Sequence, residues 1–228
     1  MADRSLRLLL FDFDGTLVDS QRIIVAAMRE AFAGARLAAP EVALVKRVVG
    51  LTLETAVARL LPPDSEGTLA ARLAGHYRQA FFRLRQDPAY HEPLYPGAAE
   101  TLLALDRPPV RLGIATGKSR RGLMAVLERH ALTSHFVTLQ TADDNPSKPD
   151  PAMVRRAMAE AGVEAAETAV IGDTVYDMEM ARAAGAVALG VAWGYHEPSE
   201  LLAAGAATIV PRFEALPAAL ASLEEKAA

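Results

Sequence analysis

Short apolar runs that alternate with helix-like stretches are the feature that most limits how this chain can fold. Such alternation is typical of a parallel sheet with helices on both faces. We expect strands at 6–13, 110–116, 136–140, 168–172, 187–193 and 207–210, each a short apolar run. From residue 97 onward, helix-like stretches separate them at 97–106, 119–131, 151–162, 174–185 and 198–204.

Residues 19–87 show a different pattern, with no clear strand signal. Ile24, Met28, Ala31 and Ala35 recur at helical spacing, and a proline-rich stretch then returns the chain to the sheet. This pattern predicts a helical block inserted after the first strand, which would cover the site as a lid. We therefore expect an α/β core domain at 1–18 and 93–228, a helical cap domain at 19–92, and hinges at 17–19 and 92–96.

Two aspartates directly follow the first predicted strand. Asp12 and Asp14 are two residues apart, so on extended backbone both side chains point to one face. Neighbouring carboxylates repel each other, and burial raises their pKa values further. A fold tolerates such a pair where a cation or a reaction uses it. Gly15 then allows the backbone to turn sharply and approach a ligand.

Polar residues also follow other predicted strands, at Thr116-Gly117-Lys118, at Lys148, and at Asp173 with Asp177 one helical turn later. The carboxyl ends of parallel strands meet at one edge of a sheet, where ligands bind. Four aspartates there would need a hard cation such as Mg²⁺, which works alongside substrate phosphate. Thr116, Gly117 and either Lys118 or Lys148 would then hold that phosphate. One carboxylate could attack phosphorus, and its neighbour could transfer the proton.

These residues resemble the four motifs of the haloacid dehalogenase superfamily. Asp12-Phe13-Asp14-Gly15-Thr16 is similar to the first motif, and Thr116, Lys148 and Gly172-Asp173 with Asp177 are similar to the others, in the same order. The resemblance implies an α/β fold: a Rossmann-like three-layer core with a parallel sheet, plus an inserted all-helical cap domain.

The resemblance also implies a role for each residue. Asp12 would be the nucleophile, and Asp14 the general acid/base, with its main-chain carbonyl on Mg²⁺. Asp12, Asp14, Asp173 and Asp177 would form the metal site. Thr116 and Lys148 would bind phosphate, with Lys148 also offsetting carboxylate charge. Thr16 is a further phosphate-binding candidate, the alternative being that its hydroxyl fixes the turn.

In the helical insert, either Arg47 or the turn at 50–52 is a candidate to face substrate. Arg47 lies in a basic pair ahead of Gly50-Leu51-Thr52, between two predicted helices. The alternative is that Gly50 simply ends a helix.

The implied function is a Mg²⁺-dependent phosphatase that hydrolyses a small phosphorylated metabolite through an aspartyl-phosphate. Dehalogenases of the superfamily lack the second aspartate, so Asp14 favours phosphate chemistry. Residues 12–20, 115–119 and 190–195 look most like phosphoglycolate phosphatases. The alternatives are a sugar-phosphate mutase similar to β-phosphoglucomutase, or an inorganic pyrophosphatase of the same fold. A receiver domain phosphorylated on aspartate would be much shorter than 228 residues.

Composition narrows the partners. A net charge of -4 argues against a protein that binds nucleic acid through phosphate contacts. The absence of cysteine excludes disulfides and thiolate metal sites. No stretch reaches the roughly 18 apolar residues of a membrane span, and the first residues lack the apolar core of a signal peptide. We therefore expect a cytoplasmic enzyme.

Overall fold

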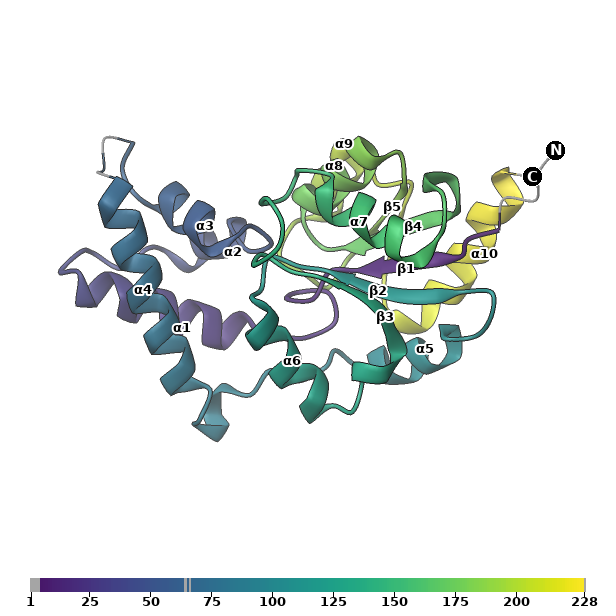
Figure 1. Cartoon of the computed structure of the whole chain (residues 1–228). Helices are drawn as coiled ribbons and strands as arrows, with labels where there is room; N and C mark the ends of the chain where they lie inside the picture. Colours follow the sequence, from purple (N-terminus) through teal and green to yellow (C-terminus); the bar gives the residue numbers. More distant parts are fainter. Residues whose placement is uncertain (1–4, 64, 66, 228) are drawn as a thin grey trace.

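The computed structural model describes residues 5–227 apart from residues 64 and 66. A six-stranded parallel sheet forms one part, and a group of helices inserted after its first strand forms the other (Figure 1). The strand order is β3-β2-β1-β4-β5-β6, so the first strand lies in the middle. The strands are β1 (Leu8–Phe11), β2 (Arg111–Ala115), β3 (Phe136–Gln140), β4 (Thr168–Gly172), β5 (Val187–Val191) and β6 (Thr208–Val210).

Helices cover both faces of this sheet. They are α5 (Ala98–Leu105), α6 (Arg120–Arg129), α7 (Ala152–Ala161), α8 (Val175–Ala184), α9 (Pro198–Ala204) and α10 (Leu216–Ala227). In β1, Leu8 and Leu10 pack with α7, α8 and α9, whereas Leu9 and Phe11 pack with α5, α6 and α10. This alternation buries both faces of the strand. The predicted three-layer α/β core is therefore confirmed.

Strand β1 is shorter than the predicted segment 6–13, because the chain begins to turn directly after it. The Asp12 amide still donates to the Ile171 carbonyl oxygen at 2.8 Å, which continues the β1–β4 pairing. The amides of Leu17 and Val18 instead donate back to the Phe13 carbonyl oxygen. The two aspartates therefore stand at a strand-to-turn junction.

The insert folds around its own apolar cluster. It contains α1 (Gln21–Gly34), α2 (Val42–Arg47), α3 (Leu53–Leu60), α4 (Gly67–Leu84) and the 3-10 turn η1 (Pro88–Tyr90). Ile23 and Ala27 from α1, Val57 from α3 and Leu73 from α4 are fully buried in this cluster. The apolar spacing that predicts helices in this segment therefore marks the side chains that hold them together.

The two chain connections to the insert lie side by side. The Asp19 amide donates to the Pro93 carbonyl oxygen at 2.8 Å, and the Tyr95 amide donates to that of Leu17 at 3.0 Å. Val18 and Leu94 form an isolated antiparallel bridge. The two segments predicted as hinges are thus joined by backbone hydrogen bonds.

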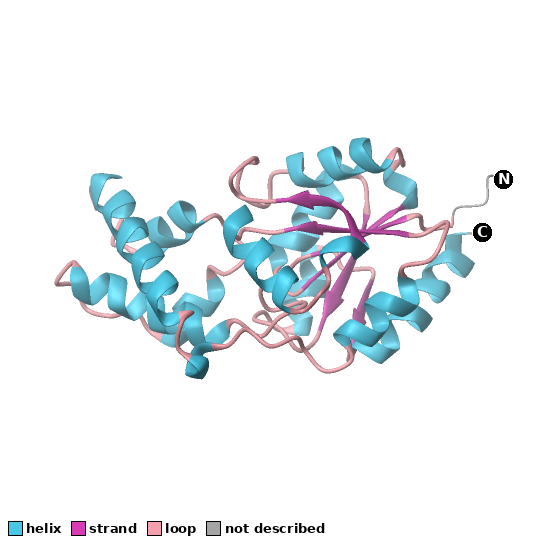
Figure 2. Cartoon of the chain, turned by 60° about the horizontal axis from the view of Figure 1, so that its bottom comes forward, coloured by secondary structure: helices cyan, strands magenta, loops and turns pink. Residues whose placement is uncertain are grey.

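The strands point toward the insert (Figure 2). The strand order reverses between β1 and β4, which are neighbours in the sheet although not in sequence. Ligands of such sheets bind outside the carboxyl ends of the strands at this reversal. The fold therefore places the expected site between the sheet and the insert. No helix among the described residues is long and apolar enough to cross a membrane.

Two adjacent leucines of α5 test this packing. Leu102 is fully buried in the core, whereas Leu103 is 52% exposed. We expect Leu102→Ala to lower the free energy of unfolding by about 2–5 kcal/mol, through lost burial and a new cavity. Leu103→Ala should change it by less than about 0.5 kcal/mol. Urea unfolding of both variants measures this, and equal losses would contradict the orientation of α5.

Candidate active site

Three buried carboxylates meet beyond the ends of β1 and β4. Asp12 directly follows β1, Asp173 directly follows β4, and Asp177 lies in the first turn of α8. Each offers one carboxylate oxygen, and these oxygens lie within 4.8 Å of one another. All three residues are at most 1% exposed. Such a concentration of buried negative charge requires a compensating cation.

Lys148 supplies one positive charge from the loop before α7. Its Nζ lies 2.8 Å from Asp12 Oδ1 and 2.6 Å from Asp177 Oδ1, and its side chain is fully buried. Burial lowers the pKa of Lys148, but the attraction of Asp12 and Asp177 outweighs it and raises the net pKa above its ordinary value. Lys148 therefore stays protonated and fixes the two carboxylates relative to each other.

Asp12 keeps acceptor capacity that the described residues do not use. Lys148 is close enough for an ion pair, but neither carboxylate oxygen of Asp12 has an aligned hydrogen-bond donor. Burial, followed by the Asp177 charge and opposed by Lys148, raises the pKa of Asp12 to about 7. An additional cation beside Asp12 would lower this pKa and satisfy the free oxygens. The all-carboxylate donor set suits a hard, oxygen-preferring metal ion.

Neighbouring groups hold the other two carboxylates in place. Asp173 accepts hydrogen bonds from the Thr16 hydroxyl and from the Tyr195 amide, both at 2.8 Å. Asp177 accepts from the amide and hydroxyl of Thr174 in a capping box at the start of α8. Burial and the charges of Asp12 and Asp177 raise the pKa of Asp173 well above its ordinary value.

Gly15 lets the turn after β1 pass close to this cluster. Its φ of +92° lies in the left-handed region, and an added Cβ would lie 2.4 Å from Asp173 Oδ2 and from Cε2 of Tyr195. Only glycine fits this position without strain. This agrees with the sharp turn that the sequence predicts.

Asp14 belongs to a second charged network. Its Oδ1 lies 2.8 Å from Lys118 Nζ, which also lies 2.8 Å from Glu92 Oε1. Arg85 donates to the other oxygen of Glu92 from just past the end of α4. Burial raises the pKa of Glu92, but Lys118 and Arg85 outweigh it and hold the net pKa below its ordinary 4.5. This network links the insert, the hinge and Asp14.

Sequence reasoning did not identify Glu92 or Arg85 as part of the site. Glu92 stands in a proline-rich connection and Arg85 in an arginine-rich segment, so in the sequence both are typical of solvated charges. The Glu92 side chain is instead completely buried. The only sequence signal is the position of Glu92 at a predicted hinge.

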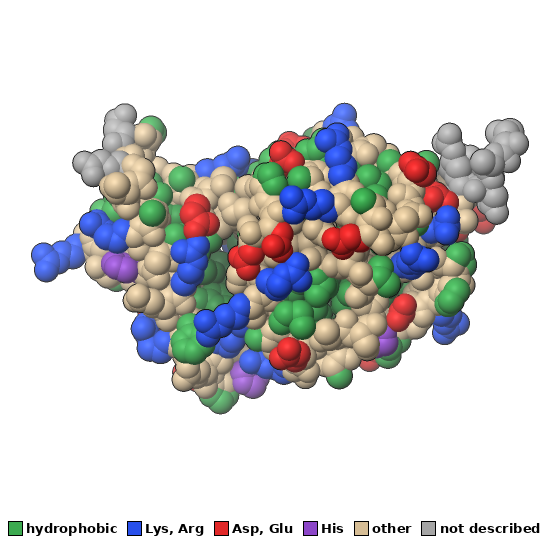
Figure 3. Space-filling model, in the orientation of Figure 1, with side chains coloured by type: hydrophobic (Ala, Val, Ile, Leu, Met, Phe, Trp, Pro, Cys, Tyr) green, Lys and Arg blue, Asp and Glu red, His purple; other side chains and the backbone are tan. Residues whose placement is uncertain are grey.

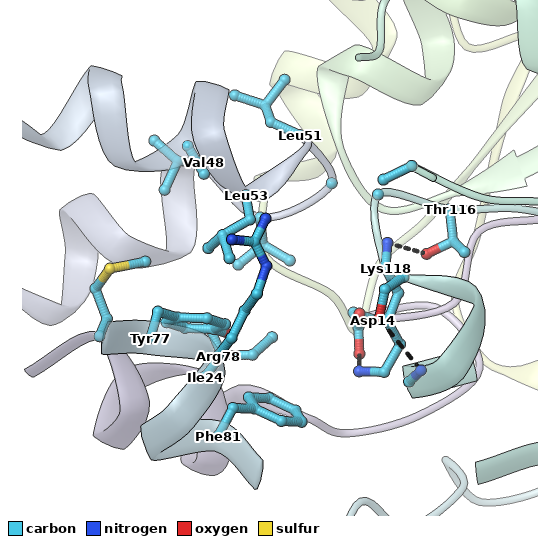
Figure 4. A pocket seen from close by; sticks show the side chains of 18 of the residues that line it. Asp14, Ile24, Val48, Leu51, Leu53, Tyr77, Arg78, Phe81, Thr116 and Lys118 are labelled. Carbon is cyan, nitrogen blue, oxygen red and sulfur yellow. Dashed lines mark hydrogen bonds and ion pairs between the residues drawn. The ribbon is translucent and has the colours of Figure 1, made fainter. Parts of the chain in front are cut away.

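A cavity of about 530 Å³ opens between the sheet and the insert. In Figure 3 it is the hollow between the two parts, with hydrophobic side chains visible inside it and charged ones around it. Asp12, Asp14, Thr116, Gly117 and Lys118 line the sheet side. Figure 4 shows Asp14, Thr116 and Lys118 facing Ile24, Tyr77 and Phe81 of the insert.

The phosphate-binding candidates divide into two groups. Thr116, Gly117 and Lys118 line the cavity, and an added Cβ on Gly117 would lie 2.4 Å from the Leu51 carbonyl oxygen of the insert. Thr16 is not among the lining residues, since its hydroxyl is directed at Asp173. Lys118, predicted to hold phosphate, is paired with Asp14 and Glu92.

Arg47 is not brought into the cavity. Its guanidinium lies 2.5 Å from Glu200 on α9, and its carbonyl oxygen accepts a hydrogen bond from Tyr176. The end of α2 therefore packs against the outside of the sheet domain, and the side chain points to that contact. Of the two candidates in the insert, Arg47 therefore does not line the cavity, whereas Gly50 and Leu51 of the 50–52 turn do.

The chain is similar to known proteins over most of its length. The family model of the haloacid dehalogenase-like hydrolases matches residues 9–191. A Dickeya dadantii protein named "Probable phosphatase IndB" is 36% identical over 208 residues, covering 90% of each chain. A Rhodospirillum rubrum "Phosphoglycolate phosphatase" is 34% identical, covering 86% of this chain and 83% of its own.

A solved structure is similar in fold. The crystal structure of "a predicted phosphoglycolate phosphatase from haemophilus somnus 129pt" superposes with a TM-score of 0.82 at 20% identity. The match covers 93% of this chain and 96% of the other. At this level of identity, the likeness concerns the fold alone.

Two glutamates test the buried network. We expect Glu92→Gln to lower the free energy of unfolding at pH 7 by about 3 kcal/mol, because it leaves buried cations without their partner. Glu54→Gln should cost less than about 1 kcal/mol, since its pair with Arg78 is exposed.

The stabilisation that Glu92 provides should depend on pH. The folded pKa of Glu92 lies below 4.5, so its stabilisation is present above that pH and is lost as pH falls through the folded pKa. The stability gap between the original protein and Glu92→Gln should therefore shrink in acid. Denaturant unfolding from pH 7 to pH 3 measures it, and a gap that stays constant would contradict the ionised, paired state of Glu92.

Proposed function

The chain belongs to the haloacid dehalogenase-like hydrolase family and is a phosphatase of that family, and we propose that it hydrolyses phosphate monoesters through a phosphorylated Asp12 with the help of Mg²⁺. The observation that carries the proposal is the buried Asp12 carboxylate. It lies next to Lys148 and two further carboxylates, and neither of its oxygens has an aligned hydrogen-bond donor among the described residues. The relatives named phosphoglycolate phosphatase support hydrolysis of a small phosphorylated metabolite.

Asp12 is positioned to act as the nucleophile. Asp12 is among the residues that line the cavity, and its carboxylate, held beside Lys148, would attack phosphorus as nucleophilic carboxylates do in phosphoryl transfer. Attack forms the bond between Asp12 and phosphorus and breaks the bond between phosphorus and the ester oxygen. Lys148 restrains the rotation of the carboxylate, so that attack needs little reorganisation.

Asp14 serves as the acid and base in this proposal. It lies two residues after Asp12 and lines the same cavity. It would donate a proton to the departing ester oxygen and then accept one from the water that attacks the aspartyl-phosphate. Lys118 and Glu92 hold the Asp14 side chain in place through these steps.

A metal ion fits the carboxylate cluster. Asp12, Asp173 and Asp177 would hold it, joined by the Asp14 main-chain carbonyl that the family resemblance implies. When bound, Mg²⁺ would polarise the phosphoryl oxygens and neutralise developing charge. Thr116 would bind phosphate from the end of β2, and Gly117 would let the backbone come close.

Replacing the nucleophile tests the reaction. We expect Asp12→Asn to reduce phosphate release from p-nitrophenyl phosphate by a factor on the order of 10³ or more, since an amide cannot form the intermediate. Asp19→Asn, at an exposed aspartate of the first hinge, should retain activity. Substantial turnover by Asp12→Asn would contradict the proposal. Isomer formation from hexose phosphates, or activity restricted to pyrophosphate, would favour the alternative enzymes of this fold.

Removing one carboxylate tests the metal site. Mg²⁺ binding should raise the melting temperature, because a ligand that binds the folded state stabilises it. We expect Asp173→Asn to weaken the binding about 10- to 100-fold. Asp143→Asn, at an exposed aspartate elsewhere on the cavity wall, is the matched control. Equal Mg²⁺ titrations of the two variants in thermal unfolding would contradict the assigned ligands.

A further inference from the structure

The two walls of the cavity have opposite chemical character. The sheet side carries the charged and polar residues of the candidate active site. The insert side is mainly hydrophobic, with the side chains of Ile24, Val48, Leu51, Leu53, Tyr77 and Phe81 (Figure 4). A phosphate held beside Asp12 would therefore direct its organic group toward an apolar surface.

The size of the cavity also bears on this organic group. Its volume of about 530 Å³ falls within the range of about 300–1,000 Å³ that accommodates drug-sized ligands. A two-carbon acid such as glycolate would fill a small part of it. The rest of the apolar wall would then remain in contact with water and would contribute no binding free energy.

Three of the cations on the cavity wall are already engaged in ion pairs. Arg78 pairs with Glu54, Arg85 pairs with Glu92, and Lys118 pairs with both Asp14 and Glu92.

Arg121 also lines the cavity and forms no ion pair with any described residue; its side chain is exposed, and its guanidinium lies 4.8 Å from the centre of the exposed Phe82 ring. An exposed cation adds little binding free energy because water screens its charge, so a second anionic group of the substrate would gain little here.

Tyr77 combines an apolar ring with an unused polar atom. Its ring stands 5.6 Å from that of Phe81, and its hydroxyl makes no hydrogen bond with any described residue. Burial and the charges of Asp14 and Glu92 raise the pKa of Tyr77 well above its ordinary value, so the hydroxyl stays neutral. Such a residue can pack its ring against a flat apolar group and donate one hydrogen bond to a polar atom beside that group.

We infer that this enzyme prefers phosphate monoesters whose organic group is bulky, apolar and ring-containing over short phosphorylated acids, and that Tyr77 is a specificity residue for that group. This inference rests on the proposed phosphatase function. The reaction is hydrolysis, and its products are inorganic phosphate and the free alcohol. Water supplies one oxygen to the inorganic phosphate and one proton to the alcohol. The inference concerns only the group attached to the ester oxygen.

Three esters of the same alkyl type separate the possibilities. Ethyl phosphate is the reference, 2-phenylethyl phosphate adds a ring at the second carbon, and phosphoglycolate carries a carboxylate there. We expect kcat/KM for 2-phenylethyl phosphate to exceed that for ethyl phosphate at least tenfold, which corresponds to about 1.4 kcal/mol. Phosphoglycolate should not exceed ethyl phosphate.

Two variants assign this preference to the insert wall. Tyr77→Ala should reduce the preference for the ring to less than threefold, mainly through KM, with little change for ethyl phosphate. Tyr90→Ala is the matched control, because Tyr90 packs in the insert but does not line the cavity. Leu53→Arg adds a cation to the hydrophobic insert wall and should raise the relative kcat/KM for phosphoglycolate.

The outcomes that overturn the inference differ from those that overturn the function. Faster hydrolysis of phosphoglycolate than of 2-phenylethyl phosphate, or an equal loss of ring preference in Tyr77→Ala and Tyr90→Ala, would refute the specificity and leave the phosphatase assignment standing. No phosphate release from any of the three esters or from p-nitrophenyl phosphate would refute the proposed function, and the inference with it.

Discussion

The charge balance around Lys148 is the interaction on which the rest of the site depends. Three carboxylates at most 1% exposed would repel one another strongly without a cation among them. Lys148 contacts two of them and is itself completely buried, so the cluster exists only because the loop before α7 returns to the end of β1. One Lys148 charge does not balance three carboxylates. Burial, together with the Asp177 charge, raises the pKa of Asp12, and the excess of carboxylates gives the site its capacity for a metal cation.

A second charge balance connects this cluster to the helical insert. Lys118 follows β2, Glu92 belongs to the second connection and Arg85 follows α4. A chain of ion pairs runs from Asp14 through Lys118 and Glu92 to Arg85. The insert also approaches the sheet domain at Gly117, where its backbone leaves no room for a side chain. We propose that residues 19–92 act as a cap and that closing it completes the surroundings of Asp14. A moved insert would separate Arg85 from the Gly122 carbonyl oxygen that it contacts on α6.

Much of this arrangement could be predicted from the sequence, because parallel strands bring their carboxyl ends to one edge. The residues after each apolar run therefore had to converge, and Asp12, Thr116, Lys148 and Asp173 do so in the structure. Glu92 could not be found this way, since burial of a loop glutamate depends on contacts with two distant cations. Arg47 is the opposite case, because it was a candidate to face substrate and does not line the cavity. Its direction depends on how α2 packs against α9, and helical spacing within the insert does not determine that packing.

The hydrophobic insert side of the cavity could not be predicted from the sequence either. Apolar residues at helical spacing in α1 and α4 are typical of a helix core, and most of them serve that purpose. Tyr77 differs from them in two ways: its hydroxyl has no hydrogen-bond partner among the described residues, and its ring borders the cavity. Both are properties of the folded insert. Under the proposals above, tertiary packing of the insert determines the substrate specificity, whereas the residues at the strand ends determine the chemistry.

The central claim is that the buried Asp12 carboxylate becomes phosphorylated. It is tested most directly by mass spectrometry of the Asp14→Asn protein, quenched in acid during turnover of p-nitrophenyl phosphate. This leaving group needs no proton, and loss of the base should slow hydrolysis of the intermediate, so phosphorylated protein should accumulate. The account predicts one phosphoryl group located on Asp12. A protein that turns over substrate without any phosphorylated form, or that carries the phosphoryl group on another residue, would contradict it.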